Sequence, residues 1–248
     1  MPVVGSNYFV DSLDAKHAIS VRRMRVGEAI QLTDGKGLRL KGLVSKIDGQ
    51  SILVEAQSVE VEQPSTLSLG IIQALAKGDR DELSIQAATE LGVLLVCPWQ
   101  SERSISRWEG PKVTKGLARW QAIVAEAAKQ SLRVFEPTVV DPQTSKQLSQ
   151  SISEGAFGMV LVLDPTSALP LTALIAKMQA SHQVAQAFGS AQQITVVVGP
   201  EGGITDAELA DFEAAGAHRV RLGSEILRTS TAGVAALAAI QAILGSWR

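Results

Sequence analysis

The pattern of apolar and polar positions changes near residue 66. Before that point, short apolar runs are separated by turns that contain glycine, such as 33–37 and 48–49. Short strands at this spacing are typical of a small β-barrel. The pattern predicts strands over 8–10, 29–32, 38–40 and 51–54, followed by a linker at 63–66. We therefore predict two domains, 1–66 and 67–248.

From residue 67 onward, continuous apolar runs alternate with segments of helical periodicity. The runs predict strands over 67–75, 93–96, 159–163, 194–198 and 219–222, and the periodic segments predict helices that include 80–91 and 112–131. Largely apolar strands that alternate with helices are typical of a parallel sheet covered on both faces. The sequence therefore predicts an α/β fold for the second domain.

Two loops follow neighbouring strands of this predicted sheet. The Gly199–Gly203 turn (Gly-Pro-Glu-Gly-Gly) comes after 194–198, and Leu222–Ser230 comes after 219–222. Open α/β sheets bind ligands at the carboxyl ends of their strands, so we expect the two loops to form one site. Glu201 within the glycine turn would repel a phosphate, which favours a ligand with hydroxyls or positive charge. A tight turn that simply requires positive φ is the alternative interpretation.

Helices are predicted to follow both loops. Thr205 and Glu208 have the spacing of a capping box. After the second loop, Ser230 or Thr231 is expected to cap an Ala-rich helix. Its small side chains favour close packing against another element, either within the chain or in a second subunit.

Composition restricts the remaining possibilities. No apolar stretch reaches the ~20 residues of a membrane helix, and the first residues do not have the pattern of a secretory signal. Cys97 is the only cysteine and the three histidines lie far apart in the sequence, so we expect neither a disulfide nor a metal site. Residues 16–46 contain eight basic residues against two acidic ones in a chain of net charge −2. This asymmetry favours a local polyanion-binding surface, and an ordinary solvated face is the alternative.

Several motifs together resemble the bacterial 16S ribosomal RNA uridine-N3 methyltransferases of the SPOUT superfamily. They occur in that family's order over nearly the whole chain: Lys77–Arg80, Ala88–Gly92, Ser101–Ser104, Arg119-Trp120, Glu126–Ser131, Gly199–Gly203 and Ile226–Thr229. The resemblance implies a PUA-like RNA-binding β-barrel followed by a SPOUT α/β domain with a deep trefoil knot. It also implies S-adenosyl-L-methionine as methyl donor, a cytoplasmic homodimer, and 16S rRNA within the 30S subunit as substrate.

The positions of individual residues indicate their roles in such a reaction. Arg228 is expected to stabilise negative charge on the uracil, and Glu201, Glu225 or a water molecule to take the N3 proton. The residues expected to hold the cofactor are Leu163, Gly199, Glu201, Gly202, Gly203, Leu222, Gly223, Ile226, Leu227 and Thr229. Those expected to contact RNA are His17, Arg22, Arg23 and Arg25. Ser230 stands where the family usually has Glu, which argues against a general base at that position.

Three other functions compete with this interpretation. A nicotinamide-dependent oxidoreductase would need Gly-x-Gly-x-x-Gly after the first strand of the sheet, and residues 76–79 do not supply it. A non-catalytic RNA-binding protein would explain the basic segment but leave the two C-terminal loops without a role. Ribose 2′-O-methylation is the nearest alternative within the superfamily.

Overall fold

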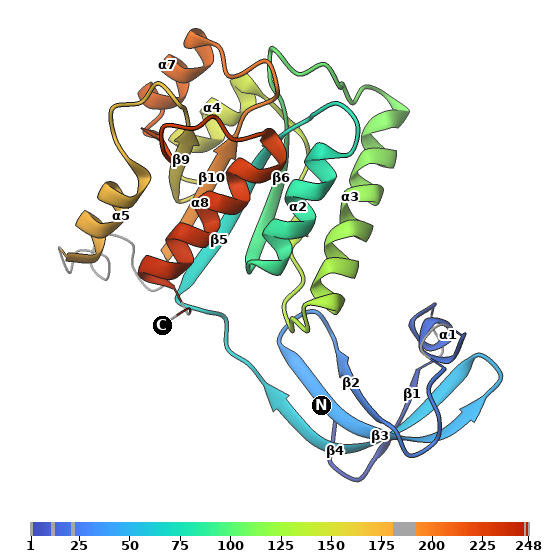
Figure 1. Cartoon of the computed structure of the whole chain (residues 1–248). Helices are drawn as coiled ribbons and strands as arrows, with labels where there is room; N and C mark the ends of the chain where they lie inside the picture. The colour runs from blue at the N-terminus through green and yellow to red at the C-terminus, as the bar shows by residue number, and fades with distance from the viewer. Residues whose placement is uncertain (1, 11–12, 21–22, 181–191, 246, 248) are drawn as a thin grey trace. The chain divides into compact units, whose positions relative to one another are not determined.

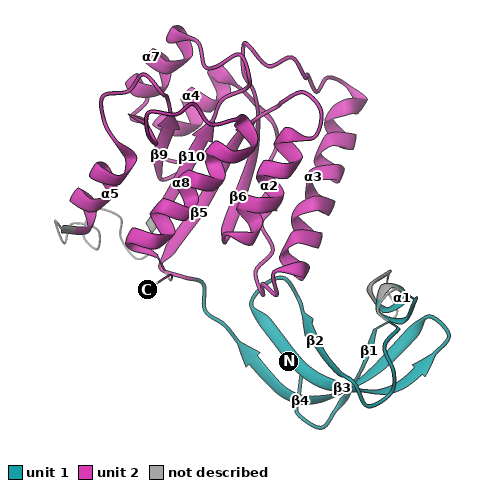
Figure 2. Cartoon of the chain, viewed as in Figure 1, with its two compact units in different colours: residues 1–64 teal, residues 65–248 magenta. Residues whose placement is uncertain are grey.

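The computed structural model describes residues 2–10, 13–20, 23–180, 192–245 and 247. The chain divides into two compact units, residues 1–64 and residues 65–248 (Figure 2). We call them the N-terminal unit and the C-terminal unit and describe each by itself.

The N-terminal unit is built on an antiparallel sheet. Its strands lie in the order β1 (Asn7–Val10), β4 (Ser51–Val61), β3 (Leu38–Asp48), β2 (Ala29–Thr33). Helix α1 (Leu13–Ser20) packs against this sheet through Ala15 and Ala18. Among the described residues, hydrogen bonding does not close the predicted barrel, because β1 and β2 are the two edges of an open sheet.

Helix α1 is a further departure from the strands predicted for this unit. Among the helix residues whose burial the structure describes, the two buried apolar ones are alanines, which are 0% and 7% exposed. Such small side chains give little periodic apolar signal, and the helix is stabilised by its contact with Val44 and Ile52 of the sheet. Tertiary packing therefore determines this helix.

The C-terminal unit contains one parallel sheet. Its strands lie in the order β11 (His218–Val220), β9 (Met159–Leu163), β10 (Gln192–Val198), β5 (Leu67–Ala74), β6 (Val93–Gln100), β7 (Thr138–Val139), and β8 (Gln143–Thr144) also pairs with β6. All of these pairings are parallel. The α/β fold predicted from the continuous apolar runs is confirmed.

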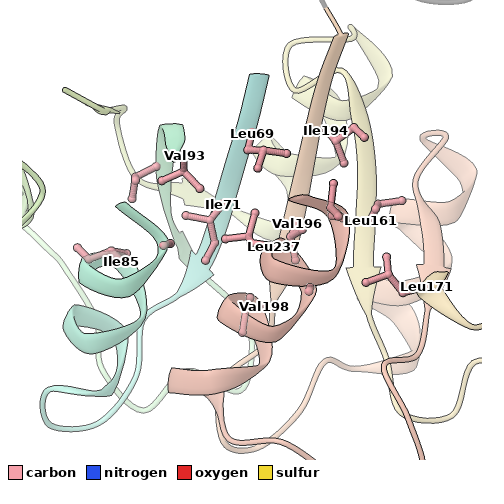
Figure 3. Packing of buried hydrophobic residues seen from close by; sticks show 14 of the residues in the cluster. Leu69, Ile71, Ile85, Val93, Leu161, Leu171, Ile194, Val196, Val198 and Leu237 are labelled. Atoms are coloured by element: carbon pink, nitrogen blue, oxygen red, sulfur yellow. The ribbon is translucent and has the colours of Figure 1, made fainter. Parts of the chain in front are cut away.

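Helices cover both faces of this sheet (Figure 1). One face carries α2 (Arg80–Glu90), α3 (Pro111–Gln130), α5 (Leu171–Ala180) and α8 (Thr229–Leu244), and the other carries α4 (Ser145–Ser153) and α7 (Asp206–Ala214). Successive residues of β5 enter different cores: Ile71 lies with Ile85 of α2 and Leu237 of α8, whereas Ile72 lies with Phe212 of α7. Figure 3 shows the first of these two cores.

Helix α8 lies very close to the sheet. A Cβ atom on Gly233 would come within 2.8 Å of Ile71 Cδ1 and 2.9 Å of Val198 Cγ2. The helix begins at Thr229 with Arg228 as its N-cap residue, and no side chain caps it. The expectation that Ser230 or Thr231 caps α8 is therefore wrong, because both lie inside the helix and the Thr231 hydroxyl donates to the carbonyl oxygen of Arg228.

Candidate functional site

The carboxyl ends of the parallel strands share one edge of the sheet, and a cavity of about 650 Å³ lies there. This volume is within the range of sites that bind small molecules. Its walls come from the segments that follow β9, β10 and β11, together with Arg80 at the start of α2 and Arg103 after β6. The expected cofactor residues that line it are Leu163, Gly199, Glu201, Gly203, Leu222, Gly223, Ile226, Leu227 and Thr229.

The buried side chain of Thr229 joins the two predicted loops. Its hydroxyl donates to the carbonyl oxygen of Gly199 over 2.8 Å and accepts from Nε2 of Gln73 over 2.9 Å. Gln73 is fully buried at the end of β5, and Thr229 is 6% exposed. The Thr229 hydroxyl is therefore engaged by the protein, and it fixes the two loops relative to each other.

Glu201 is held by the connection between β5 and α2. Its Oε1 accepts from Nη1 of Arg80 over 2.8 Å and from the backbone N–H of Lys77 over 3.2 Å. Burial alone would raise the pKa of Glu201, but hydrogen bonds from its own backbone, from Arg80 and from Lys77 outweigh burial and hold the pKa below the ordinary value. Glu201 is thus an anionic anchor for the glycine turn.

Asp81 holds the other side of the same connection. Its Oδ2 accepts from the backbone N–H of Ala76 over 3.1 Å, and burial raises the pKa of this carboxyl. From the sequence alone, Arg80 has no assigned role. The signal that could have revealed it is the Lys77–Arg80 motif, which directly follows a strand of the sheet, where loops that build sites are found.

Positive groups line one part of the cavity. Arg228 is exposed and lies at the N-terminus of α8. The first N–H groups of a helix have no partner within the helix, and the helix dipole is positive at that end. Arg103 also lines the cavity, and its Nη1 donates to the carbonyl oxygen of Gly202 over 3.0 Å. Gly202, expected among the cofactor residues, thus supports the position of Arg103.

Carboxylates line other parts of the cavity. Glu225 is exposed, and its Oε1 accepts from the hydroxyl of Ser224 over 3.0 Å. Asp164 accepts from Arg219 and from Thr166, and these hydrogen bonds outweigh the effect of its burial and lower its pKa. Asp206 also lines the cavity. The site therefore presents both signs of charge beside the apolar side chains of Leu163, Val198 and Leu222.

Arg23 and Arg25 are exposed on the N-terminal unit, on either side of Met24, which is only 7% exposed. Met24 is therefore an anchor that turns the two arginines outward. Arg23 has a φ of 53°, an unusual backbone conformation for a residue with a side chain. Arg22 lies outside the described residues, and His17 lies in α1 with a side chain outside the description.

The basic segment is partly neutralised. Three of its cations form ion pairs: Arg39 with Glu62, Lys41 with Glu60, and Lys46 with Asp48. The unpaired charge described in this segment is therefore concentrated toward α1 and the connection that follows it.

Some kinds of site find no support in the described residues. Across these residues, no group of three or more His, Cys, Asp or Glu side chains could hold a metal ion. No helix in this part of the chain has the length and apolarity that crossing a membrane requires. Cys97 is buried, and burial raises the pKa of its thiol to about 12, which is incompatible with a thiolate nucleophile at neutral pH.

Two family models match the chain. Residues 63–241 match an RNA methyltransferase domain, and residues 13–57 match an RNA methyltransferase PUA domain. Among individual proteins, the chain is 36% identical to ribosomal RNA small subunit methyltransferase E of Mycobacterium bovis over 100% of its own length and 90% of the relative's. The protein of the same name from Bacillus subtilis is 31% identical over 92% of this chain and 86% of the relative.

Solved structures are similar as well. The crystal structure of a ribosomal RNA small subunit methyltransferase E from Neisseria gonorrhoeae bound to S-adenosyl methionine has a TM-score of 0.83. It is 29% identical, and the alignment covers 100% of this chain and 96% of that one. A putative methyltransferase from Legionella pneumophila, in complex with the same cofactor, has a TM-score of 0.80 at 26% identity, over 98% of this chain and 94% of that one.

Proposed function

The chain belongs to the RNA methyltransferase family, and we propose that it transfers a methyl group from S-adenosyl-L-methionine to N3 of a uridine in 16S rRNA. The observation that carries the proposal is the single cavity in which both C-terminal loops, Arg228 and Glu225 meet. The relatives named above as small subunit methyltransferases support the substrate class, and the two cofactor-bound neighbours support the methyl donor.

The residues of the cavity fit this cofactor. Leu163, Leu222 and Leu227 offer apolar contact to an adenine ring, and the backbone of the Gly199–Gly203 turn offers polar groups to its edge. The protein carboxylates that line the cavity suit the positive ammonium and sulfonium groups of the cofactor. The guanidinium group of Arg103 or Arg80 suits the carboxylate of the cofactor. When bound, the cofactor supplies an electrophilic methyl group whose bond to sulfur breaks as the new bond to nitrogen forms.

Within this reaction, Arg228 stabilises the anion that forms when uracil N3 loses its proton. The charge spreads over O2 and O4, and a guanidinium in a preformed position lowers its energy in the transition state. The uncapped N-terminus of α8 adds a positive dipole at the same place. Glu225 takes the N3 proton, because among the described residues its carboxylate accepts only from the hydroxyl of Ser224, at Oε1.

Glu201 has a different role in this proposal. Its ion pair with Arg80 and its lowered pKa make it a poor proton acceptor. We therefore assign Glu201 to holding the glycine turn in the shape that the cofactor needs. Ser230 stands inside the first turn of α8 and is left without a catalytic role.

We assign different roles to the two units. We assign RNA binding to the N-terminal unit, through the exposed Arg23 and Arg25 with His17 and Arg22, and methyl transfer to the C-terminal unit. Phosphate contacts of this kind position a substrate without reading its sequence. Since the substrate is 16S rRNA in the 30S subunit, the protein acts in the cytoplasm.

Exposed apolar groups favour a homodimer. Ile226 at the cavity is 82% exposed, and Leu83 on α2 is 50% exposed. A second copy that covers these side chains would enclose the cofactor and remove apolar surface from water.

We further propose that residues 222–229 thread through the segment after β9 and so form the trefoil knot. Arg221 lies directly before these residues and against that segment. Its backbone N–H donates to the carbonyl oxygen of Leu169, and its carbonyl oxygen accepts from the backbone N–H of Leu171.

Three measurements test the proposed function. Calorimetry with S-adenosyl-L-methionine should give a defined binding constant, and sedimentation should give a dimer. Mass spectrometry of nucleosides from 30S subunits treated with the enzyme should reveal N3-methyluridine. Methylation on the ribose would identify a 2′-O-methyltransferase instead, and RNA binding without cofactor binding would identify a non-catalytic RNA-binding protein.

A further inference from the structure

The connection between β6 and α3 presents several exposed side chains. Arg103, Ile105 and Arg107 are exposed, and Ile105 is 70% exposed, whereas Ser101 and Ser104 are buried. We call the side chains of Arg103, Ile105 and Arg107 the Arg103–Arg107 ridge. Along the chain, two guanidinium groups thus flank one exposed apolar side chain.

This ridge stands on a rigid base. Glu208, which is 2% exposed, accepts from the backbone N–H of Glu102 over 2.8 Å and from the hydroxyl of Ser145 over 2.5 Å. The same carboxylate accepts from Thr205 in the capping box of α7. A buried carboxylate with several donors holds the backbone that it contacts firmly in place.

The far end of the connection is held as well. Nη2 of Arg107 donates to the carbonyl oxygen of Glu102 over 3.1 Å, and the backbone N–H of Trp108 donates to Oε1 of Gln100 over 2.9 Å. These hydrogen bonds within the connection fix its backbone, and the exposed side chains of the ridge project from it.

The ridge adjoins the cavity. Arg103 donates to Gly202 within the glycine turn, and a Cβ atom on Gly202 would lie 3.1 Å from Cβ of Arg103. The glycine at 202 thus allows the ridge to lie directly against the loop that we assign to the cofactor. Arg107 lies four residues further along and is not among the residues that line the cavity.

Both cations of the ridge remain available to an anion. In the part of the chain that the structure describes, neither Arg103 nor Arg107 forms an ion pair, whereas Arg80 pairs with Glu201 and Arg119 with Glu82. Arg103 and Arg107 each use one N–H on a backbone carbonyl, which leaves further donors of each guanidinium free. The carboxylate of Glu102 accepts from the hydroxyl of Thr205.

We propose that the Arg103–Arg107 ridge binds the RNA strand next to the nucleotide that enters the cavity. The two guanidinium groups hold phosphates, and Ile105 contacts the sugar or base between them. This inference rests on the proposed function, because it requires that a nucleotide occupies the cavity. A base that enters a pocket brings its sugar–phosphate backbone across the rim. The ridge adjoins this cavity through Arg103 and offers two guanidinium groups to phosphates from a rigid loop.

Measurements on the whole 248-residue chain with a 16S rRNA fragment test the proposal. Arg107→Gln, Arg103→Gln and the double variant should each weaken RNA binding, the double by at least tenfold at 100 mM salt. The slope of log K against log salt should become shallower by about 1.4 in the double variant, since each lost contact with single-stranded RNA removes about 0.7. The matched control is Lys177→Gln on α5, an exposed cation outside the ridge, which should change neither quantity.

Cofactor affinity and oligomeric state separate the possible outcomes. Arg107→Gln should leave calorimetric binding of S-adenosyl-L-methionine within twofold of the native value. If the ridge variants still methylate RNA and show unchanged RNA affinity and salt slope, the proposed role of the ridge is wrong, and the proposed function is unaffected. RNA affinity that falls only together with dissociation of the dimer would identify the ridge as a subunit interface. Failure of the native protein to bind cofactor would count against the proposed function, while RNA binding by the variants would still test the ridge.

Discussion

The hydroxyl of Thr229 donates to the carbonyl oxygen of Gly199 over 2.8 Å and joins two loops that are 30 residues apart in the sequence. The same hydroxyl accepts from Gln73, whose side chain is fully buried. The glycine turn after β10 and the segment that starts α8 are thereby held as one wall of the cavity. A ligand that contacts both loops meets a preformed surface, which lowers the entropy cost of binding.

Thr229→Val should reduce stability by about 1–3 kcal/mol, because it removes the acceptor of one N–H of the buried Gln73 side chain and the hydroxyl that donates to the carbonyl oxygen of Gly199. Cofactor affinity should fall as well, since the two loops are no longer held together. Urea unfolding and calorimetry measure the two effects. Thr229→Ser keeps the hydroxyl and is the control; if it behaves like the valine variant, packing of the methyl group matters more than the hydrogen bonds.

The ion pair between Arg80 and Glu201 should make stability depend on pH. The pKa of Glu201 is lowered from 4.5 in the folded protein, so its contribution is complete above 4.5 and is lost as pH falls through the lower, folded value. Glu201→Gln should therefore have a lower Tm than the native protein at pH 7, and the difference should shrink as the pH falls below 4.5. A difference that stays constant over this range would show that the charge of Glu201 contributes nothing to stability.

Arg228→Met should lower the rate of methyl transfer by at least about 10²-fold, in line with the loss of one preorganised electrostatic contact. Cofactor affinity should stay within a few-fold, because the role we assign to Arg228 concerns the uracil. Single-turnover methylation and calorimetry give the two values, and Arg228→Lys should restore part of the rate. Equal losses of rate and affinity would place Arg228 in cofactor binding instead.

Gly233→Ala should destabilise the protein even though alanine is the better helix former by about 1 kcal/mol. The added Cβ would meet Ile71 and Val198 at distances below 3.0 Å, and overpacking of this kind costs about 1–3 kcal/mol. The free energy of unfolding in urea measures the outcome. Ala242→Gly on the exposed side of α8 gives the propensity effect alone, and a stabilised Gly233→Ala would show that α8 can move away from the sheet.

Much of the C-terminal unit could be predicted because its signals are local. The run 194–198 is apolar except for Thr195, which indicates a buried parallel strand, and the capping box of Thr205 and Glu208 is present as expected. The two loops could be placed together because parallel strands end at one edge of the sheet. These inferences use neighbours in the sequence or a general rule of topology.

Other features depend on residues that are far apart in the sequence. Arg80 and Glu201 pair across 121 positions, and nothing in either segment indicates that the other is its partner. The hydroxyl of Thr229 could not be assigned to Gly199 and Gln73 before the three strands were arranged. The start of α8 at Thr229 also follows from this contact, whereas capping propensity alone favoured Ser230 or Thr231.

The end of α3 contains a strained residue that a single substitution should relieve. Leu132 has a φ of 56°, and it occupies the position after the C-cap residue Ser131 where glycine is usual. Backbone N–H groups of Leu132 and Arg133 donate to Lys129 and Ala128, which is the hydrogen-bond pattern that requires this left-handed conformation. The side chain is 63% exposed, so little burial is lost when it is removed.

Leu132→Gly should therefore stabilise the protein by about 0.5–1 kcal/mol, because the relief of strain exceeds the entropy that glycine adds to the unfolded chain. Equilibrium unfolding in urea should show a higher midpoint at an unchanged slope. Leu132→Ala separates the two causes, since it removes the apolar side chain and keeps the Cβ atom in the left-handed conformation. A glycine variant no more stable than the alanine variant would mean that the turn after α3 stores no strain at this position.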